Sequence, residues 1–128
     1  MPVATGSTLT LTLVPVPESA RRARRVIVNR GLDPDLEHTV SLLTTELLAN
    51  AIKHAPSTAE VRLAAALAPG YARVEVLDEG PGFDPDAVTS GLGLRLVDKL
   101  ASSWGVERGD RGTLVWFEVD RRRRRFTR

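Results

Sequence analysis

The fold is decided by the segment Glu46-Leu-Leu-Ala-Asn50-Ala-Ile-Lys53-His54-Ala55, together with Asp78-Glu-Gly80-Pro-Gly82 and Gly91-Leu-Gly93-Leu94 further along the chain. In a helix, Glu46, Asn50 and His54 stand four residues apart and form one polar row, with Lys53 beside it. The two glycine-rich segments allow the backbone to approach a ligand closely. A carboxylate, an amide, a base and an ammonium group next to such segments predict a site for a nucleoside triphosphate and a divalent cation.

Each polar side chain of the first segment suits that chemistry. The amide oxygen of Asn50 is a hard ligand of the kind that Mg²⁺ prefers. Glu46, one helical turn earlier, is a candidate general base that accepts a proton from an attacking hydroxyl or water. Lys53 adds positive charge near phosphates. Taken alone, these residues are more often a solvated helix face, so the interpretation depends on the glycine-rich segments.

The glycine-rich segments supply the other half of the predicted site. Asp78 ends an apolar strand candidate, where a fixed carboxylate can accept a hydrogen bond from an exocyclic amine such as that of adenine. Gly80 and Gly82 let the backbone approach a flat ring. Gly91 and Gly93 open a predicted helix whose N-terminus attracts phosphate. Each segment is weak evidence by itself, since turns of this composition are common.

The patterning outside these segments predicts a single domain. We expect strands over 8–14, 59–68, 72–77, 104–108 and 113–119, and helices over 18–30, 33–55 and 91–103. The long helix carries an apolar stripe of Leu36, Val40, Leu43, Leu47 and Ala51, and the last helix one of Leu94, Val97 and Leu100. The predicted class is α+β: a two-layer sandwich with helices packed on one face of a mixed, mostly antiparallel sheet.

Composition narrows the class of protein. The 128 residues include no Cys, which excludes disulfides and thiolate metal sites, and the two His do not form a convincing zinc site. No signal peptide and no apolar run of roughly 20 residues is present, so we expect a cytoplasmic protein.

The net charge of +2 comes from the C-terminal end. Residues 121–128 carry six Arg and no acid, and the rest of the chain has 12 basic and 16 acidic residues, a net charge of −4. We therefore predict a flexible N-terminus over 1–7, a folded domain over 8–120 and a basic disordered tail over 121–128. We expect no direct nucleic-acid partner and no membrane association.

The three segments, in this order, resemble the GHKL ATPase superfamily, whose ATP site is called the Bergerat fold. Residues 46–55 resemble its N box, 78–82 its first glycine box and 91–94 its second. Thr113 resembles the Thr of the terminal strand that supports adenine binding. The resemblance covers roughly residues 8–120.

Within the superfamily, the chain is similar to the stand-alone anti-sigma-factor serine/threonine kinases of actinobacterial type. Only residues 83–90 separate the two glycine boxes, which corresponds to a short ATP lid. The resemblance implies ATP and Mg²⁺ as cofactors, and as partners a sigma factor, an anti-anti-sigma antagonist protein and a second copy of the chain. In this family the first helix contributes to partner binding, so the cluster from Arg21 to Arg25 is the candidate contact surface.

The resemblance also assigns roles to single residues. It implies Glu46 as the general base for a partner's Ser or Thr hydroxyl, Asn50 as the Mg²⁺ ligand and Asp78 as the contact of the adenine amine. The pocket and lid would be shaped by Gly80, Gly82, Gly91 and Gly93, and the backbone of Leu94 would face phosphate.

Two alternatives stay open. Leu92 stands where this branch often carries Arg, which leaves room for an ATP-gated binding module without phosphotransfer. Lys53 resembles the Lys of histidine-kinase N boxes and allows a detached histidine-kinase catalytic domain. Against the second, only about 30 residues precede the long helix, and His38 is followed by Thr39 rather than by an acid. A gyrase-like ATPase would need a transducer domain.

Overall fold

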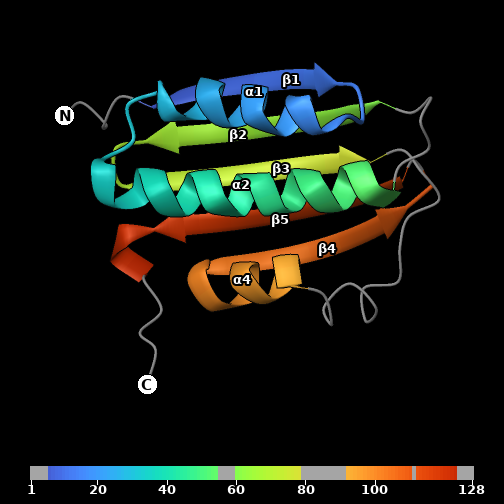
Figure 1. The fold of residues 1–128 in the computed structure, drawn as a ribbon. Coiled ribbons are helices and arrows are strands. Elements are labelled where there is room, and N and C mark those ends of the chain that lie inside the picture. The colour runs from blue at the N-terminus through green and yellow to red at the C-terminus, as the bar shows by residue number, and fades with distance from the viewer. Residues whose placement is uncertain (1–5, 55–59, 79–91, 111, 124–128) are drawn as a thin grey trace.

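The computed structural model describes residues 6–54, 60–78, 92–110 and 112–123, without the side chains of 54, 92 and 93. The elements, in chain order, are β1 (Ser7–Leu13), α1 (Pro17–Val28), α2 (Pro34–His54), β2 (Val61–Ala68), β3 (Tyr71–Asp78), α4 (Leu92–Leu100), β4 (Ser103–Gly109), β5 (Gly112–Asp120) and the 3-10 helix η1 (Arg121–Arg123). Figure 1 shows the helices α1, α2 and α4 laid across one face of the sheet. The predicted two-layer α+β architecture is confirmed.

The sheet has the order β1-β2-β3-β5-β4. Every pairing among the described strands is antiparallel. The predicted sheet was mixed and mostly antiparallel, and no parallel pair occurs among these strands. The turn at Pro69-Gly70 joins β2 to β3, as these two turn-forming residues predict. β3 and β5 lie at the centre of the sheet beneath α2 (Figure 1).

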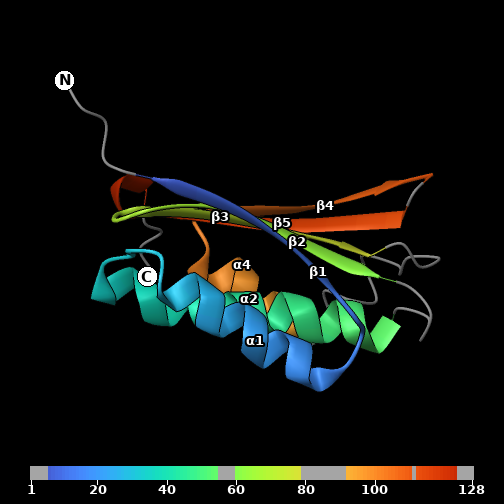
Figure 2. The same cartoon turned by 90° about the horizontal axis from the view of Figure 1, so that it is seen from above.

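One face of the sheet is packed and the other is open. Successive side chains of a strand point to opposite faces, and buried residues alternate with less buried ones along β2, β3 and β5. Seen from above, all three helices lie on the same side of the sheet, and no described element covers the other side (Figure 2). We call this second side the open face.

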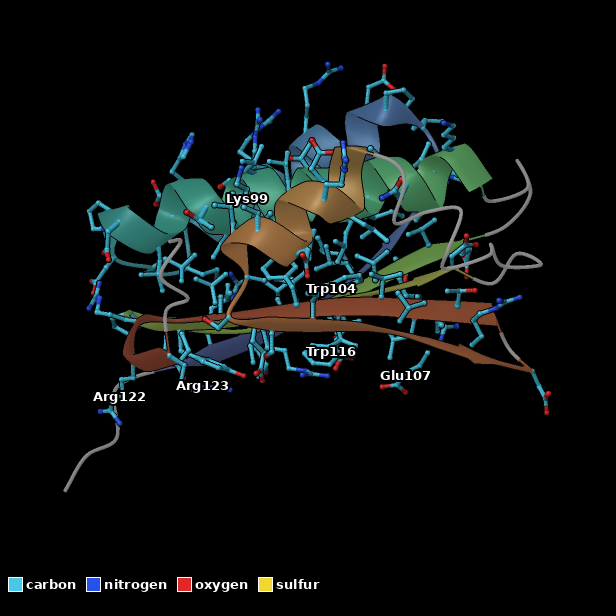
Figure 3. All side chains as sticks on the ribbon, turned by 90° about the horizontal axis from the view of Figure 1, so that it is seen from below. Lys99, Trp104, Glu107, Trp116, Arg122 and Arg123 are labelled. Atoms are coloured by element: carbon cyan, nitrogen blue, oxygen red, sulfur yellow. The ribbon has the colours of Figure 1, made fainter. Side chains whose placement is uncertain are left out.

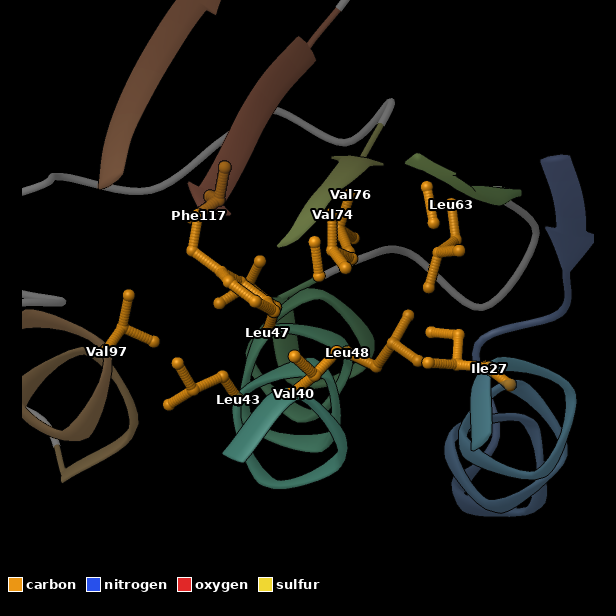
Figure 4. Close-up of a cluster of buried hydrophobic side chains, with 14 of the residues drawn as sticks. Ile27, Val40, Leu43, Leu47, Leu48, Leu63, Val74, Val76, Val97 and Phe117 are labelled. Atoms are coloured by element: carbon orange, nitrogen blue, oxygen red, sulfur yellow. The ribbon is translucent and has the colours of Figure 1, made fainter. Parts of the chain in front are cut away.

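The core lies between α2 and the packed face. The predicted stripe of α2 is confirmed, since all five of its residues are buried: Leu36, Val40, Leu43, Leu47 and Ala51. They meet apolar side chains from the strands and from the other two helices, among them Phe117 and Ile27 (Figure 4). Because α2 is held along its whole length, its polar side chains have fixed positions above the central strands.

The predicted stripe of the last helix is wrong at one position. Leu94 and Val97 are buried, but Leu100 is 41% exposed and Ala101 is fully buried instead. α4 ends at Leu100, and the chain turns there towards β4. Leu94, Val97 and Ala101 are spaced i, i+3 and i+7, so the helical period continues through Ala101, and the prediction took the residue next to the one that enters the core.

Part of the predicted basic tail has a defined structure. Arg121–Arg123 form η1, and the Arg121 guanidinium lies 2.7 Å from the Asp33 carboxylate and 2.6 Å from that of Asp35. Two contacts therefore connect the end of β5 to the start of α2. Residues 124–128 lie outside the described residues. Among the described helices, none is both long and apolar enough to cross a membrane.

Candidate functional site

A small cavity lies between α2 and the ends of the two central strands. Its walls come from three elements: Leu47, Asn50 and Ala51 of α2, Val76 and Asp78 of β3, and Thr113 and Val115 of β5. Its volume is about 10 Å³, which is enough for about one water. Any larger ligand must extend beyond these walls.

Strand register and helical spacing explain why these residues meet. Asp78 pairs with Thr113, and Val76 pairs with Val115, across the antiparallel β3–β5 ladder. Since residues two apart share a face, both pairs point towards α2. Asn50 lies three residues after Leu47 on α2, on the side of the helix that faces the strands.

The cavity contains polar atoms without partners. The Asn50 Nδ2 and the Thr113 Oγ1 are buried, and neither has a hydrogen-bond partner in the described part of the chain. Such a group costs about 1–3 kcal/mol of folding free energy, so buried polar groups in native proteins nearly always have a partner. The hydroxyls of Ser7, Ser41 and Thr44 are also buried without a partner among the described residues, but none of them lines this cavity. Two such atoms at one cavity favour a ligand or a water that satisfies them.

The chemistry of the walls matches a purine with an exocyclic amine. The aliphatic side chains of Leu47, Val76 and Val115 offer flat apolar contacts, as ligand sites commonly do. The Asp78 side chain, 1% exposed, is an acceptor for an amine. The hydroxyl of Thr113, also 1% exposed, can donate or accept beside it.

A magnesium ion at this site would depend on few protein ligands. The described residues include no group of three or more His, Cys, Asp or Glu that could hold a metal. Mg²⁺ commonly uses one or two protein oxygens together with waters and substrate phosphates. The amide oxygen of Asn50 would be one such ligand, and the residue lies half-buried at the cavity wall.

The other predicted site residues lie around this cavity or outside the description. Glu46 is half-buried on α2, one turn before Asn50, but does not line the cavity. Lys53 is exposed near the end of α2. The Leu94 side chain is in the core, which leaves only its backbone for a ligand. Gly93 lies in the first turn of α4, and Gly80, Gly82 and Gly91 fall outside the described residues.

The apolar walls of the cavity were not predicted as parts of a site. Val76 and Val115 stand two residues from Asp78 and Thr113, respectively, and Ala51 follows Asn50 directly. Alternation along the strands could have identified Val76 and Val115, because a residue two positions from a predicted site residue lies on the same face of the sheet.

A second polar cluster, centred on Glu118, lies on the open face. The Glu118 carboxylate accepts hydrogen bonds from the Tyr71 hydroxyl (2.8 Å), the Ser103 hydroxyl (2.9 Å) and the guanidinium groups of Arg73 (3.4 Å) and Arg123 (2.8 Å). Burial alone would raise the pKa of Glu118, but hydrogen bonds from Arg123, Tyr71 and Ser103 outweigh it and lower the pKa to about 2. Burial and the bond to Glu118 raise the pKa of Tyr71 to about 12. We call these five residues the Glu118 cluster.

Comparison with known proteins agrees with the geometry of the cavity. No curated protein matches the chain significantly. The family described as "Histidine kinase-like ATPase domain" matches residues 9–119, a range that contains every wall residue of the cavity and nearly all of the fold. The chain belongs to this family of histidine kinase-like ATPase domains and thus to the GHKL superfamily.

Proposed function

We propose that this protein is an ATP-dependent serine/threonine kinase and anti-sigma factor, which phosphorylates an anti-anti-sigma antagonist protein. The observation that carries the nucleotide part is the cavity with the unpartnered Asn50 Nδ2 and Thr113 Oγ1. The family supports an ATP-binding, kinase-like ATPase. Specificity for Ser or Thr and the identity of the partners belong to the proposal.

ATP fits the residues that are present. Asp78 and Thr113 would hold the adenine edge, and the apolar walls would contact the ring. Asn50 would provide the protein oxygen for Mg²⁺. When bound, ATP supplies the phosphoryl group that is transferred.

Glu46 is our candidate for the general base. It lies one turn before Asn50 on the same rigid helix, so its carboxylate stays near the metal ligand while standing outside the adenine cavity. A half-buried carboxylate in that place can accept the proton of a partner's Ser or Thr hydroxyl. The proton moves from that hydroxyl oxygen to a carboxylate oxygen of Glu46.

The exposed side of α1 supports an acidic protein partner. Arg22, Arg24 and Arg25 are exposed and make no ion pair with any other described residue, and Arg21 makes only a 3.8 Å pair with Glu18. Unpaired positive charge on one face favours a partner with a complementary acidic surface and speeds its association. We assign this side of α1 to the sigma factor or to its antagonist.

A second candidate function is ATP-gated partner binding without phosphotransfer. The position of Glu46 outside the cavity wall favours it, because no described contact directs that carboxylate towards a substrate. In that case ATP would change the affinity for the partner by favouring one conformation. An activity assay separates the two functions.

The test combines γ-labelled ATP, the purified protein and a lysate of its source organism. We expect an acid-stable label on a second, small protein. Glu46→Ala should keep ATP affinity within about twofold and reduce the transfer rate by about 10²–10⁴-fold, the usual contribution of a general base. Glu37→Ala, at the start of the same helix, is the matched control and should change neither quantity.

Three outcomes would contradict parts of the proposal. Transfer by Glu46→Ala at the wild-type rate would exclude Glu46 as the base. An acid-labile label would indicate a phosphohistidine and therefore a histidine kinase. Normal ATP binding without any labelled protein would favour the binding module.

A further inference from the structure

β1 lies at one edge of the sheet, and no described segment pairs with its outer side. Among the described strands β2 is its only neighbour, and apart from the β1–β2 ladder no backbone hydrogen bond of the described residues involves residues 8–12. In Figures 1 and 2, β1 and α1 together form this edge of the molecule. An unpaired strand edge is a template to which another extended chain can add, so natural proteins usually protect such edges.

The pairing of the strands shows which backbone groups of β1 point outwards. The Arg121 N–H donates to the Gly70 carbonyl (3.0 Å), so these two residues form a hydrogen-bonded pair at the end of the β3–β5 ladder. The backbone groups of successive residues point to alternate neighbours, and the registers carry this alternation from β3 through β2 to β1. The N–H and C=O groups of Thr8, Thr10 and Thr12 therefore point away from β2.

β1 lacks the features that commonly protect an edge strand. Residues 7–13 contain no charged residue and no Pro, and they pair one to one with β2, without a bulge. The side chains of Thr8, Thr10 and Thr12 are exposed, whereas Leu9 and Leu13 are buried on the packed face. Because threonine favours the extended conformation, the edge is already shaped for pairing.

The other edge of the sheet is better protected. β4 carries the exposed charged side chains of Glu107 and Arg108, and α4 packs against it. Figure 3 shows Trp104 on the packed side of β4 beneath α4, and Glu107 on the opposite side. Charged side chains and a covering helix are two common means of preventing strand addition. Of the two edges, β1 is therefore the one that can accept a further strand.

The charges beside β1 indicate what kind of strand fits there. Arg22, Arg24 and Arg25 of α1 make no ion pair with any other described residue, and Arg21 makes only the 3.8 Å pair with Glu18. Acidic side chains on an added strand complement these guanidinium groups. A second copy that paired through β1 would keep both helical layers on one side and bring two arginine-rich α1 helices together, where charges within about 10 Å repel each other.

We propose that the outer edge of β1 binds an extended segment of a partner protein, which adds to the sheet as a further strand and in which β-branched residues alternate with acidic ones. The backbone groups of Thr8, Thr10 and Thr12 provide the hydrogen bonds, and the acidic side chains contact the arginines of α1. The site shares these arginines with the partner surface proposed above. It needs neither ATP nor phosphotransfer, so its test and the kinase assay can fail separately.

The first test is amide hydrogen exchange of the full chain, followed by NMR, with a synthetic peptide of about eight residues in which Val alternates with Glu. In the free protein, the amides of Thr10 and Thr12 should exchange quickly and those of Leu9 and Leu11 slowly, because only the leucines bond to β2. Saturation with the peptide should slow the exchange of Thr10 and Thr12 by at least about tenfold.

The second test measures peptide affinity by fluorescence anisotropy. Thr10→Pro removes the outward N–H group, and an edge strand tolerates proline where that group faces solvent. We expect the dissociation constant to rise by at least about tenfold. Thr10→Val keeps the N–H and the strand preference, so this matched control should stay within about twofold of the wild type. A peptide in which Val alternates with Lys should bind about tenfold more weakly than the acidic peptide.

Circular dichroism of each variant shows that it is folded. Unchanged exchange of Thr10 and Thr12 at saturating peptide would overturn the proposal. So would equal binding of the acidic and basic peptides, or binding by Thr10→Pro at the wild-type affinity. Slow exchange of both amides in the free protein that becomes fast on dilution would assign the edge to a second copy instead.

Discussion

Two polar clusters on β3 and β5 differ in one respect, the number of hydrogen bonds that they make. On the open face, the Glu118 carboxylate accepts four hydrogen bonds from side chains of the same chain. On the packed face, the Asn50 Nδ2 and the Thr113 Oγ1 are buried without a partner among the described residues. The first cluster is complete within the protein alone, and the second requires something more.

Under the proposed function, this difference separates residues that stabilise the fold from residues that would bind a ligand. Satisfied polar groups on a central sheet hold the strands in register, and each bond contributes about 1 kcal/mol. Unsatisfied buried groups cost free energy in the free protein and recover it when a ligand binds. Mutations in the two clusters should therefore affect different measurements.

The largest effect on stability is expected for Glu118→Ala. This change removes the shared acceptor of Tyr71, Ser103, Arg73 and Arg123, and we expect the free energy of unfolding to fall by about 2–3 kcal/mol. Urea denaturation measures the loss, and a titration with ATP should show unchanged affinity. Glu75→Ala is the control, because its half-exposed pair with Arg73 contributes less than about 1 kcal/mol. Equal losses of stability in both variants would show that Glu118 stabilises the fold no more than Glu75 does.

Thr113→Val should show the opposite pattern. Valine has the shape of threonine without the hydroxyl, so the variant loses a buried oxygen that has no partner in the described part of the chain. Its stability should stay equal or rise by up to about 1 kcal/mol. The affinity for ATP should fall by about tenfold, which corresponds to one hydrogen bond. Thr12→Val, at an exposed position of β1, is expected to change neither value. A Thr113→Val protein that is less stable but binds ATP normally would place Thr113 among the structural residues.

A smaller effect should appear in the pH dependence of stability. The pKa of Glu118 is about 2 in the folded protein and 4.5 ordinarily, so the folded state favours the ionised form. The resulting stabilisation is complete above about pH 5 and is lost as the pH falls from there towards 2. Between these limits the wild type should lose about 1–2 kcal/mol more than Glu118→Gln does. Parallel curves for the two proteins would contradict the low pKa.

Much of the fold could be predicted because the spacing of apolar residues along the chain decides which segments form helices and strands. The stripe of α2 follows the helical period, and its five predicted residues are all buried. The last residue of the α4 stripe was ambiguous, because Leu100 and Ala101 stand three and four residues after Val97, both helical spacings, and hydrophobicity alone favours the leucine. The pairing of strands in the order β1-β2-β3-β5-β4 also depends on tertiary packing that no local pattern contains.

The two clusters were not equally predictable. Asn50, Asp78 and Thr113 were singled out by residue type, spacing and family resemblance, and the structure brings all three to one cavity. No sequence pattern predicted the Glu118 cluster, because its residues stand up to 47 positions apart and meet only through the pairing of the strands. Sequence motifs thus marked the three side chains that meet at the cavity, whereas the side chains that bond to one another in the Glu118 cluster could be found only in the structure.

The most direct test of the account is calorimetric titration of the wild type and of Asn50→Ala with ATP, with and without Mg²⁺. We predict that the wild type binds ATP more tightly with Mg²⁺, and that Asn50→Ala loses about 100-fold in affinity and most of the Mg²⁺ dependence. Its free energy of unfolding should stay within about 1 kcal/mol of the wild type, because the Asn50 Nδ2 has no partner to lose among the described residues. Unchanged affinity in Asn50→Ala, or a wild type that does not bind ATP, would contradict the assignment of this cavity.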